Sequence, residues 1–380
     1  MNLLRSTLNE LLLRLGYFLI CFIIIGTLSN VDYLMNSQQY YVHAELPISN
    51  TVKDFKLEGG SGVVAVNPNT DRVFVTNTNS DTISVFDGSN NNLISVFKVG
   101  SGPFGIGINT ETDTLYVARE RSNILTVVDG STHNIKENIE ISDPYDIAVN
   151  SNTNMIYVTS NVANSVFVID GSTNTVQTSI DIQVPCGVAV NTKTNTIYVT
   201  SETTDKVHVI DGLTNTQIDI IKVSDSPRGV AVNQETNTVY VTNQNSGTLS
   251  VIDGTINEVI DTITVGQGPR RVAVNQETNT VYVTNQNSGT LSVIDGTINE
   301  VIDTIKVIQP YEMAVDSRNN KVYITYFETG ILSIIGESLK EKSSTQSFYV
   351  FLGIAIVILV GGAVGVILRN IQVRSRIKHQ

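Results

Sequence analysis

The sequence predicts an all-β fold, a seven-bladed β-propeller closed by an N-terminal clasp strand, followed by a single C-terminal transmembrane helix. The first observation behind this prediction is that residues 230–263 and 272–305 consist of the same 34 letters. Looser copies of this unit recur every 41 or 42 residues. Each copy contains four short apolar stretches, and four strands in about 40–45 residues is the period of a propeller blade.

Three short motifs mark each unit and count seven of them. A Val-Asn motif ends at Asn67, Asn109, Asn150, Asn191, Asn233, Asn275 and, as aspartate, at Asp316. A Tyr-Val-Thr motif has its aromatic residue at Phe74, Tyr116, Tyr157, Tyr198, Tyr240, Tyr282 and Tyr323. An Asp-Gly motif has its aspartate at Asp87, Asp129, Asp170, Asp211, Asp253 and Asp295. The apolar stretches are rich in Val, Ile, Thr and Tyr, and Asn, Gly and Asp separate them, which indicates short strands joined by tight turns.

The two ends of the repeat region complement each other. The seventh unit has three strand-like stretches and no fourth. Residues 51–57, TVKDFKL, precede the first unit at the spacing of a fourth strand. We therefore expect this N-terminal strand to complete the last blade, because a closed ring leaves no open sheet edge there.

Residues 1–44 are predicted to be an export signal or a signal anchor with a tether, and residues 45–336 to be the propeller. Arg5 and Arg14 precede the apolar run 15–28. A positive flank before a run of this length is typical of a secretory signal, and the run is short for a spanning helix. Cleavage and retention of this segment both stay open.

The C-terminal part predicts a membrane anchor. Residues 337–347 form a polar linker, and residues 348–368 are 21 residues without a charge. At ~1.5 Å per residue such a helix crosses a hydrocarbon core of ~30 Å. The basic tail 369–380 follows, so the positive-inside rule predicts a cytoplasmic tail and an extracellular propeller. We expect the membrane to be one partner through residues 348–368.

A propeller chain runs inward and outward in turn, so its loops fall on two faces. The top face carries the connections between units and the loops between second and third strands; the bottom face carries the other turns. The clasp strand starts at the bottom, and the last strand of the seventh unit ends there. Both tethers are therefore expected to leave from the bottom face, which would face the membrane.

Composition narrows the classes of partner. The formal net charge is −12, and basic residues gather at the two ends of the chain. Nucleic acid is not an expected partner, because phosphate contacts need clusters of Lys and Arg. Cys21 and Cys186 lie in different parts of the chain and do not form a plausible disulfide.

The top face is where the units differ most. A proline precedes the first strand of six units, and the residues after it are predicted to ring the mouth of the central channel. The candidate ligand-binding residues on this rim are Phe104, Tyr145, Asp146, Cys186, Arg228, Arg270, Arg271, Tyr311 and Glu312. One interpretation is a ligand site on variable loops of a rigid scaffold. The other is that the aromatic rings plug the channel and the charges pair with each other.

No catalytic group of residues is predicted, and no cofactor or metal is expected. His43 and His379 lie in the tails, His133 lies in a bottom turn, and His208 lies inside a third strand, where it is expected to be packed. No metalloprotease, nucleophile-elbow or phosphate-loop motif occurs. The repeated Asp and Asn residues fit tight turns better than calcium loops, because the D-x-[DN]-x-[DN]-G pattern is missing.

The letters YVTN at 240–243 and 282–285, with VAVN before and VIDG after, resemble the YVTN-repeat β-propeller family of surface-layer-like exported proteins. This resemblance covers about residues 51–335 and implies a seven-bladed ring. Similar propellers serve as adhesion modules, and related rings include lyases and lactonases with histidine, glutamate or metal ligands in the channel. This chain has no histidine at the positions predicted to line the channel, so no catalytic residue is carried over.

Three functions follow as expectations. The first is a membrane-anchored extracellular module that binds an unidentified protein or glycan on the face away from the membrane. The second is a structural, surface-layer-like component of the cell envelope that packs through the sides of its blades. The third and weakest is a lyase- or lactonase-like propeller enzyme.

Overall fold

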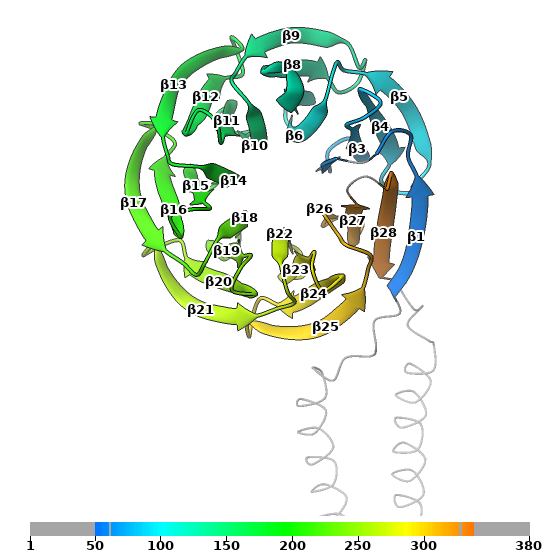
Figure 1. The fold of residues 1–380 in the computed structure, drawn as a ribbon. Helices are drawn as coiled ribbons and strands as arrows, with labels where there is room; N and C mark the ends of the chain where they lie inside the picture. The colour runs from blue at the N-terminus through cyan, green and yellow to red at the C-terminus, as the bar shows by residue number, and fades with distance from the viewer. Residues whose placement is uncertain (1–49, 61, 327–328, 338–380) are drawn as a thin grey trace, which may run out of the picture. The chain divides into compact units, whose positions relative to one another are not determined.

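The computed structural model describes residues 50–60, 62–326 and 329–337, which form seven four-stranded antiparallel sheets arranged around one axis (Figure 1). The first strand of each sheet contacts the first strands of the two neighbouring sheets. First strands therefore line the axis and fourth strands lie outermost. The predicted all-β, seven-bladed propeller is confirmed.

The strands of the first four blades run from the axis outward in chain order. Blade 1 contains β2 (Val64–Asn67), β3 (Arg72–Asn77), β4 (Thr82–Asp87) and β5 (Leu93–Lys98). Blade 2 contains β6 (Pro103–Asn109), β7 (Thr114–Arg119), the 3-10 helix η1 (Glu120–Ser122), β8 (Ile124–Asp129) and β9 (Ile135–Glu140). Blade 3 contains β10 (Pro144–Asn150), β11 (Met155–Ser160), β12 (Ser165–Asp170) and β13 (Thr175–Asp181). Blade 4 contains β14 (Pro185–Asn191), β15 (Thr196–Ser201), β16 (Lys206–Asp211) and β17 (Thr216–Lys222).

The remaining blades follow the same order, except that the last one takes a strand from the other end of the chain. Blade 5 contains β18 (Pro227–Asn233), β19 (Thr238–Asn243), β20 (Thr248–Asp253) and β21 (Glu258–Thr264). Blade 6 contains β22 (Pro269–Asn275), β23 (Thr280–Asn285), β24 (Thr290–Asp295) and β25 (Glu300–Lys306). Blade 7 contains β26 (Glu312–Asp316), β27 (Lys321–Tyr326), β28 (Ile331–Glu337) and, outermost, β1 (Asn50–Lys56).

The clasp is the antiparallel pair formed by β1 and β28. Its register runs from Asn50 opposite Glu337 to Lys56 opposite Ile331. The ring of Phe55 meets the ring of Phe86 in blade 1 edge-on, with centroids 5.6 Å apart. The predicted N-terminal clasp is confirmed, and both ends of the propeller lie at its bottom face.

The core lies between neighbouring blades, where second and third strands are almost fully covered. Tyr198 of β15 packs in one cluster with Val239 and Ile252 of blade 5. Burial of these tyrosine rings removes a large apolar area from water. Tyr157 also donates a hydrogen bond of 3.1 Å to Asn215 Oδ1 in a turn of blade 4. The repeated tyrosine therefore holds each blade to the next.

A belt of side-chain hydrogen bonds runs around the bottom face. Each asparagine that ends a first strand is fully buried and donates from Nδ2, over 2.7 Å, to the side chain of a turn residue in the next blade. The pairs are Asn67–Asp113, Asn109–Asn154, Asn150–Asn195, Asn191–Asn237, Asn233–Asn279 and Asn275–Asn320. The Oδ1 of the same asparagine accepts backbone N–H groups of its own turn, as at Asn233, which accepts from Glu235. The Val-Asn motif is thus a joint between blades.

The belt changes between blades 7 and 1, where aspartate replaces asparagine. Asp316 has only acceptor oxygens when ionised. The amide of Asn319 supplies the missing donor. Its Nδ2 donates to Asp71 Oδ1 over 2.7 Å and to Asp316 Oδ2 over 2.8 Å. The ring therefore closes on the bottom face through a bridging amide.

Within the described residues, no helix is long and apolar enough to span a membrane. The predicted export segment 1–44, most of the linker 337–347, the transmembrane helix 348–368 and the tail 369–380 lie outside the described residues.

Candidate functional site

The predicted rim residues of blades 2 to 6 lie at or beside β-bulges at the start of the first strands, whereas Tyr311 and Glu312 of blade 7 lie at the start of β26, where no bulge occurs. We expected them in loops, but the structure places the preceding prolines and the rim residues of blades 2 to 6 inside β6, β10, β14, β18 and β22. In β10, Pro144 pairs with Ser160 and Ile147 with Val158, so Tyr145 and Asp146 have no partner in the ladder. A bulge re-aims side chains, and here it turns them towards the axis.

Threonines of the second strands hold these bulges in place. Thr242 is fully buried, accepts the N–H of Gly229 over 2.8 Å and donates to the carbonyl of Arg270 in the next blade over 3.0 Å. Thr159 and Thr200 make the corresponding contacts in blades 3 and 4. The threonine of the Tyr-Val-Thr motif therefore fixes both its own rim segment and the next one.

The second residue after the proline differs between two groups of blades. In blades 2, 4 and 5 it is glycine, and a Cβ at Gly105 or Gly187 would lie 2.1 Å or 2.3 Å from a rim carbonyl of the following blade. In blades 3, 6 and 7 the same position holds Asp146, Arg271 and Glu312. These three charged residues are the ones that the fold brings together.

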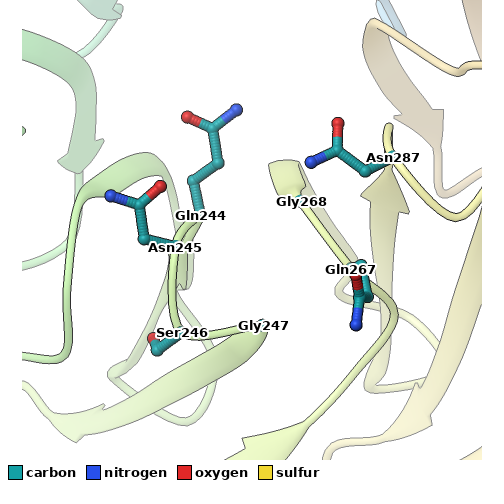
Figure 2. Close-up of a pocket in the computed structure, with 7 residues that line it drawn as sticks. All are labelled: Gln244, Asn245, Ser246, Gly247, Gln267, Gly268 and Asn287. Atoms are coloured by element: carbon teal, nitrogen blue, oxygen red, sulfur yellow. The ribbon is translucent and has the colours of Figure 1, made fainter.

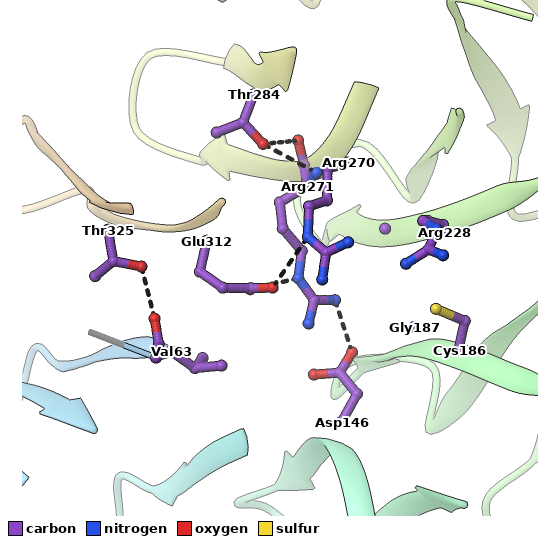
Figure 3. A network of polar contacts seen from close by, with 12 residues as sticks. Val63, Asp146, Cys186, Gly187, Arg228, Arg270, Arg271, Thr284, Glu312 and Thr325 are labelled. Carbon is purple, nitrogen blue, oxygen red and sulfur yellow. Dashed lines mark hydrogen bonds and ion pairs between the residues drawn. The ribbon is translucent and has the colours of Figure 1, made fainter. Parts of the chain in front are cut away.

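Arg271 of blade 6 lies between two carboxylates (Figure 3). Its Nη1 pairs with Asp146 Oδ2 of blade 3 over 3.1 Å, and its Nε pairs with Glu312 Oε2 of blade 7. The side chains of Arg271 and Glu312 are only 12% and 2% exposed. Burial lowers the pKa of Arg271, but Asp146 and Glu312 outweigh this effect and hold the pKa well above its usual range. Arg271 is therefore a permanent buried cation with two anionic partners.

Arg270 joins the aromatic residues of the rim. Its guanidinium carbon lies 3.7 Å from the centroid of the Tyr311 ring, and its Nη2 donates to the hydroxyl of Tyr145 over 3.2 Å. The Tyr145 ring stacks on Phe104 at 5.3 Å between centroids. Cation–π contacts of this kind gain strength where water is excluded. We call Phe104, Tyr145, Asp146, Arg270, Arg271, Tyr311 and Glu312 the cross-axis cluster.

Arg228 and Cys186 lie beside this cluster. Arg228 pairs with Glu202 of the preceding blade over 2.7 Å, and both side chains are about a quarter exposed. Burial raises the pKa of the Cys186 thiol to about 11. At neutral pH this thiol is protonated and is not an activated nucleophile.

The structure thus brings all nine predicted rim residues to the axial end of the top face. The charges of Asp146, Arg271 and Glu312 pair with each other, whereas Arg228 pairs with Glu202 outside the predicted set. Asp146 and Arg271 come from blades three places apart, so the cluster spans the axis. This is the arrangement of the second interpretation of the rim. Binding of a ligand by the rim stays a prediction.

The sequence interpretation missed a polar notch between blades 5 and 6 on the top face (Figure 2). Its volume is about 220 Å³, and its lining contains no charged residue. The lining consists of Gln244, Asn245, Ser246, Gly247, Gln267, Gly268 and Asn287. In the described part of the chain, the carboxamides of Gln244, Asn245, Gln267 and Asn287 make no hydrogen bond to protein. A signal was present in the sequence: Gly247 stands at the repeat position where blades 1 to 4 have asparagine or aspartate.

A second hollow, of about 430 Å³, lies at blade 2 and is lined by residues 122–124 and 140–142. Two of its polar side chains are already engaged. Ser122 Oγ donates to the carbonyl of Ser101, and Asn123 Oδ1 accepts the N–H of Asp143. This hollow therefore offers fewer uncommitted groups than the blade 5–6 notch.

Among residues 50–60, 62–326 and 329–337, no three His, Cys, Asp or Glu side chains are grouped so that they could hold a metal ion. His208 lies in β16 and is 9% exposed, as the sequence predicted for a packed residue.

Comparison with known proteins supports the fold and no finer assignment. No model of a protein family matches the chain, and no curated protein matches it. The YVTN-repeat family is therefore not confirmed. Among solved structures, hydrazine synthase from Kuenenia stuttgartiensis is similar, with a TM-score of 0.67 and 14% identity over 75% of this chain and 97% of that chain. At this identity the likeness shows the fold alone, and the fold that it shows is the β-propeller.

Proposed function

We propose that the protein is a membrane-anchored, extracellular binding module that takes a glycan or protein ligand on its top face. One contrast supports this proposal. On the bottom face, the asparagines of the Val-Asn motif form the belt, and the aspartates of the Asp-Gly motif accept hydrogen bonds within their own turns, as at Asn233 and Asp253. On the top face, the blade 5–6 notch presents four carboxamides without a protein partner. Free hydrogen-bonding groups on a rigid scaffold suit recognition of a polar ligand.

The proposed orientation rests on the clasp and on the apolar run after it. Asn50 and Glu337 are partners in the β1–β28 register, so the chain enters and leaves the propeller at the bottom face. Ten residues separate Glu337 from the apolar run 348–368. If that run spans a membrane, the bottom face lies near it and the top face points away. The proposal assigns no enzymatic activity and no nucleic-acid partner.

The test is a binding screen with the full-length protein in detergent micelles. Neutral and acidic polysaccharides and unrelated peptides are added, and the midpoint of thermal unfolding is measured. A ligand at about 100 times its dissociation constant stabilises the fold by about 2.7 kcal/mol. A specific rise in the midpoint supports the proposal. No rise with any probe, together with self-association of the protein, contradicts it.

A second function, a structural component that packs laterally, has one observation in its favour. Of the large apolar residues that are exposed in the described chain, most lie on the outermost strands, such as Leu93, Ile94 and Ile218. Exposed apolar edge strands favour association between copies. Each outermost strand also carries at least one charged residue, as Lys98 in β5 and Asp181 in β13, and such charges oppose edge pairing. Sedimentation at rising protein concentration distinguishes this function, because it requires association without any ligand.

A further inference from the structure

We infer that the blade 5–6 notch is a subsite for one neutral sugar ring of a glycan. This inference rests on the proposed function and assigns it a ligand class and a place. It is argued from three features: the side chain that is missing at Gly247, the groups that this leaves unpaired, and the absence of charge.

The first feature is a hydrogen bond, called here the tie, that joins the loop after the second strand to the connector in blades 1 to 4. The connector is the segment between a fourth strand and the next proline. In these blades a residue with positive φ after the second strand accepts a connector N–H on its side-chain oxygen, over 2.9–3.0 Å. The accepting residues are Asp81, Asn123, Asn164 and Asp205.

In blade 5 this position is Gly247, with φ +66, so no side chain is present to make the tie. A Cβ built on Gly247 would meet only the carbonyl oxygen of Gly266, at 3.8 Å. The space that an asparagine side chain fills in other blades is therefore open here. It forms the interior of the notch.

The second feature is the set of unpaired groups. The N–H of Gly268 corresponds to the N–H that Asp81 or Asp205 ties in other blades, and in the described structure it has no partner. Gly268 is buried, so its N–H is left for a ligand that enters the notch to pair with. Figure 2 shows Gln244 and Asn287 on opposite sides of the opening above it. The site thus has a buried donor at its base and amide donors and acceptors on its walls.

The third feature concerns charge and size. The facing loop and connector between blades 4 and 5 contain Glu202, Asp205 and Asp225, whereas residues 244–247 and 266–268 contain no charge. A carboxamide both donates and accepts, and so does a hydroxyl group, so a polyol satisfies such a lining without net charge. A volume of about 220 Å³ is below the ~300–1,000 Å³ of pockets for drug-sized ligands. One sugar ring matches this size.

The exact repeat supplies a matched control. Gln286 stands in the same loop sequence of blade 6 as Gln244 does in blade 5, but it does not line the notch. The connector beside it is one residue shorter and has Ile308 in place of Gly266. Gln244→Ala and Gln286→Ala change the same loop sequence. A difference in ligand binding between the two variants therefore reports on the notch and not on the loop.

The experiment measures binding of the full-length protein in detergent to an array of neutral oligosaccharides with terminal hexoses or N-acetylhexosamines. Acidic oligosaccharides and peptides are placed on the same array. We expect neutral glycans to bind and Gly247→Asn to weaken this binding about tenfold or more, since the asparagine fills the notch and takes the Gly268 N–H. Gly247→Asn should unfold at the same or a higher temperature than the wild type, because asparagine tolerates positive φ. Gln244→Ala should weaken binding, and Gln286→Ala should bind as the wild type does.

Two results overturn the inference. One is neutral-glycan binding that Gly247→Asn leaves unchanged, and the other is a preference for peptides or acidic glycans. In either case a ligand is still bound, so the proposed binding function survives while this subsite fails. If no member of the array binds and the protein self-associates, the proposed function fails as well.

Discussion

Arg271 Nη1 and Asp146 Oδ2 form a 3.1 Å ion pair although their blades are separated by two others in the ring. Together with the contact between Arg271 and Glu312, this pair joins three blades across the axis. A charge that is buried with its partners becomes costly when one partner is removed. The stability of the ring should therefore depend on Arg271 more than on other arginines of the top face.

We predict that Arg271→Met lowers the free energy of unfolding by about 3–5 kcal/mol, the usual cost of leaving buried charges without their partner. Arg228→Met is the control, because its pair with Glu202 is about a quarter exposed. It should cost about 1 kcal/mol or less, as surface pairs do. Urea unfolding followed by near-ultraviolet circular dichroism of the tyrosines measures both. Equal losses for the two variants would contradict a special role of the cross-axis cluster.

The bottom belt leads to a prediction about Asn319. Asn319→Ala removes the amide that lies between Asp71 and Asp316, so it should cost about 1–3 kcal/mol. In an Asp316→Asn background the new amide can itself donate to Asp71, as Asn275 does to Asn320. The cost of Asn319→Ala should then be smaller. A double-mutant cycle in urea gives the coupling, and strict additivity would show that Asn319 does not bridge the two carboxylates.

His208 makes the fold sensitive to pH. Burial lowers the pKa of His208 below its ordinary 6.5, while the hydrogen bond with Gln217 raises it and Lys206 lowers it further. Gln217 Oε1 lies 2.5 Å from Nδ1, and Nε2 is buried without a partner, so a second proton would be placed where no acceptor exists. Because the folded pKa is below the unfolded one, the unfolded state takes up the proton first as the pH falls.

The wild type should therefore lose stability as the pH falls from about 7.5 through 6.5 towards the lower folded pKa of His208. His208→Gln should flatten this part of the profile, and the wild type and the variant should differ most in slope between pH 7 and 5.5. Thermal unfolding in buffers of one ionic strength checks the sign. A wild type that gains stability on acidification, relative to the variant, would refute the assignment.

The clasp can be weakened through Phe55. Its ring is half-buried against Phe86 at 5.6 Å, so Phe55→Ala should cost about 2 kcal/mol, less than the ~3–5 kcal/mol of a fully buried ring. Val52 lies on the same strand and is 48% exposed, and Val52→Ala should change stability by less than about 0.5 kcal/mol. Limited proteolysis should then cut β28 faster in Phe55→Ala alone. Equal cutting in the two variants would show that the Phe55 contact does not hold the clasp.

The sequence predicted the ring and its closure because both depend on local pattern. Strand and turn chemistry repeats every 41 or 42 residues, and the missing fourth strand of the last unit matches the extra one before the first. The rim residues were also found, because they occupy the two repeat positions after the proline. That the rim charges pair was one of two interpretations, but which residues pair was not predictable, since Asp146 and Arg271 are 125 residues apart and meet only through the ring geometry.

Two further features were outside the reach of pattern alone. The bulges that turn Tyr145 and Asp146 inward arise from a register shift that periodicity does not reveal. The notch arises from an absent side chain, and Gly247 has meaning only beside the ties made by Asn123 and Asp205. A repeat alignment can list that substitution, but the cavity depends on how the connector lies.

The position of the two propeller ends has a mechanical consequence. Asn50 and Glu337 face each other at the end of an antiparallel pair whose hydrogen bonds lie across the strands. A force that draws these two residues apart loads the first pair alone and then each following pair in turn, so the strands peel like a zipper. If both residues were instead held by anchors that move together, the pair would carry almost no load. Tension at the base of the protein would therefore open the seventh blade first, long before it reached the notch between blades 5 and 6.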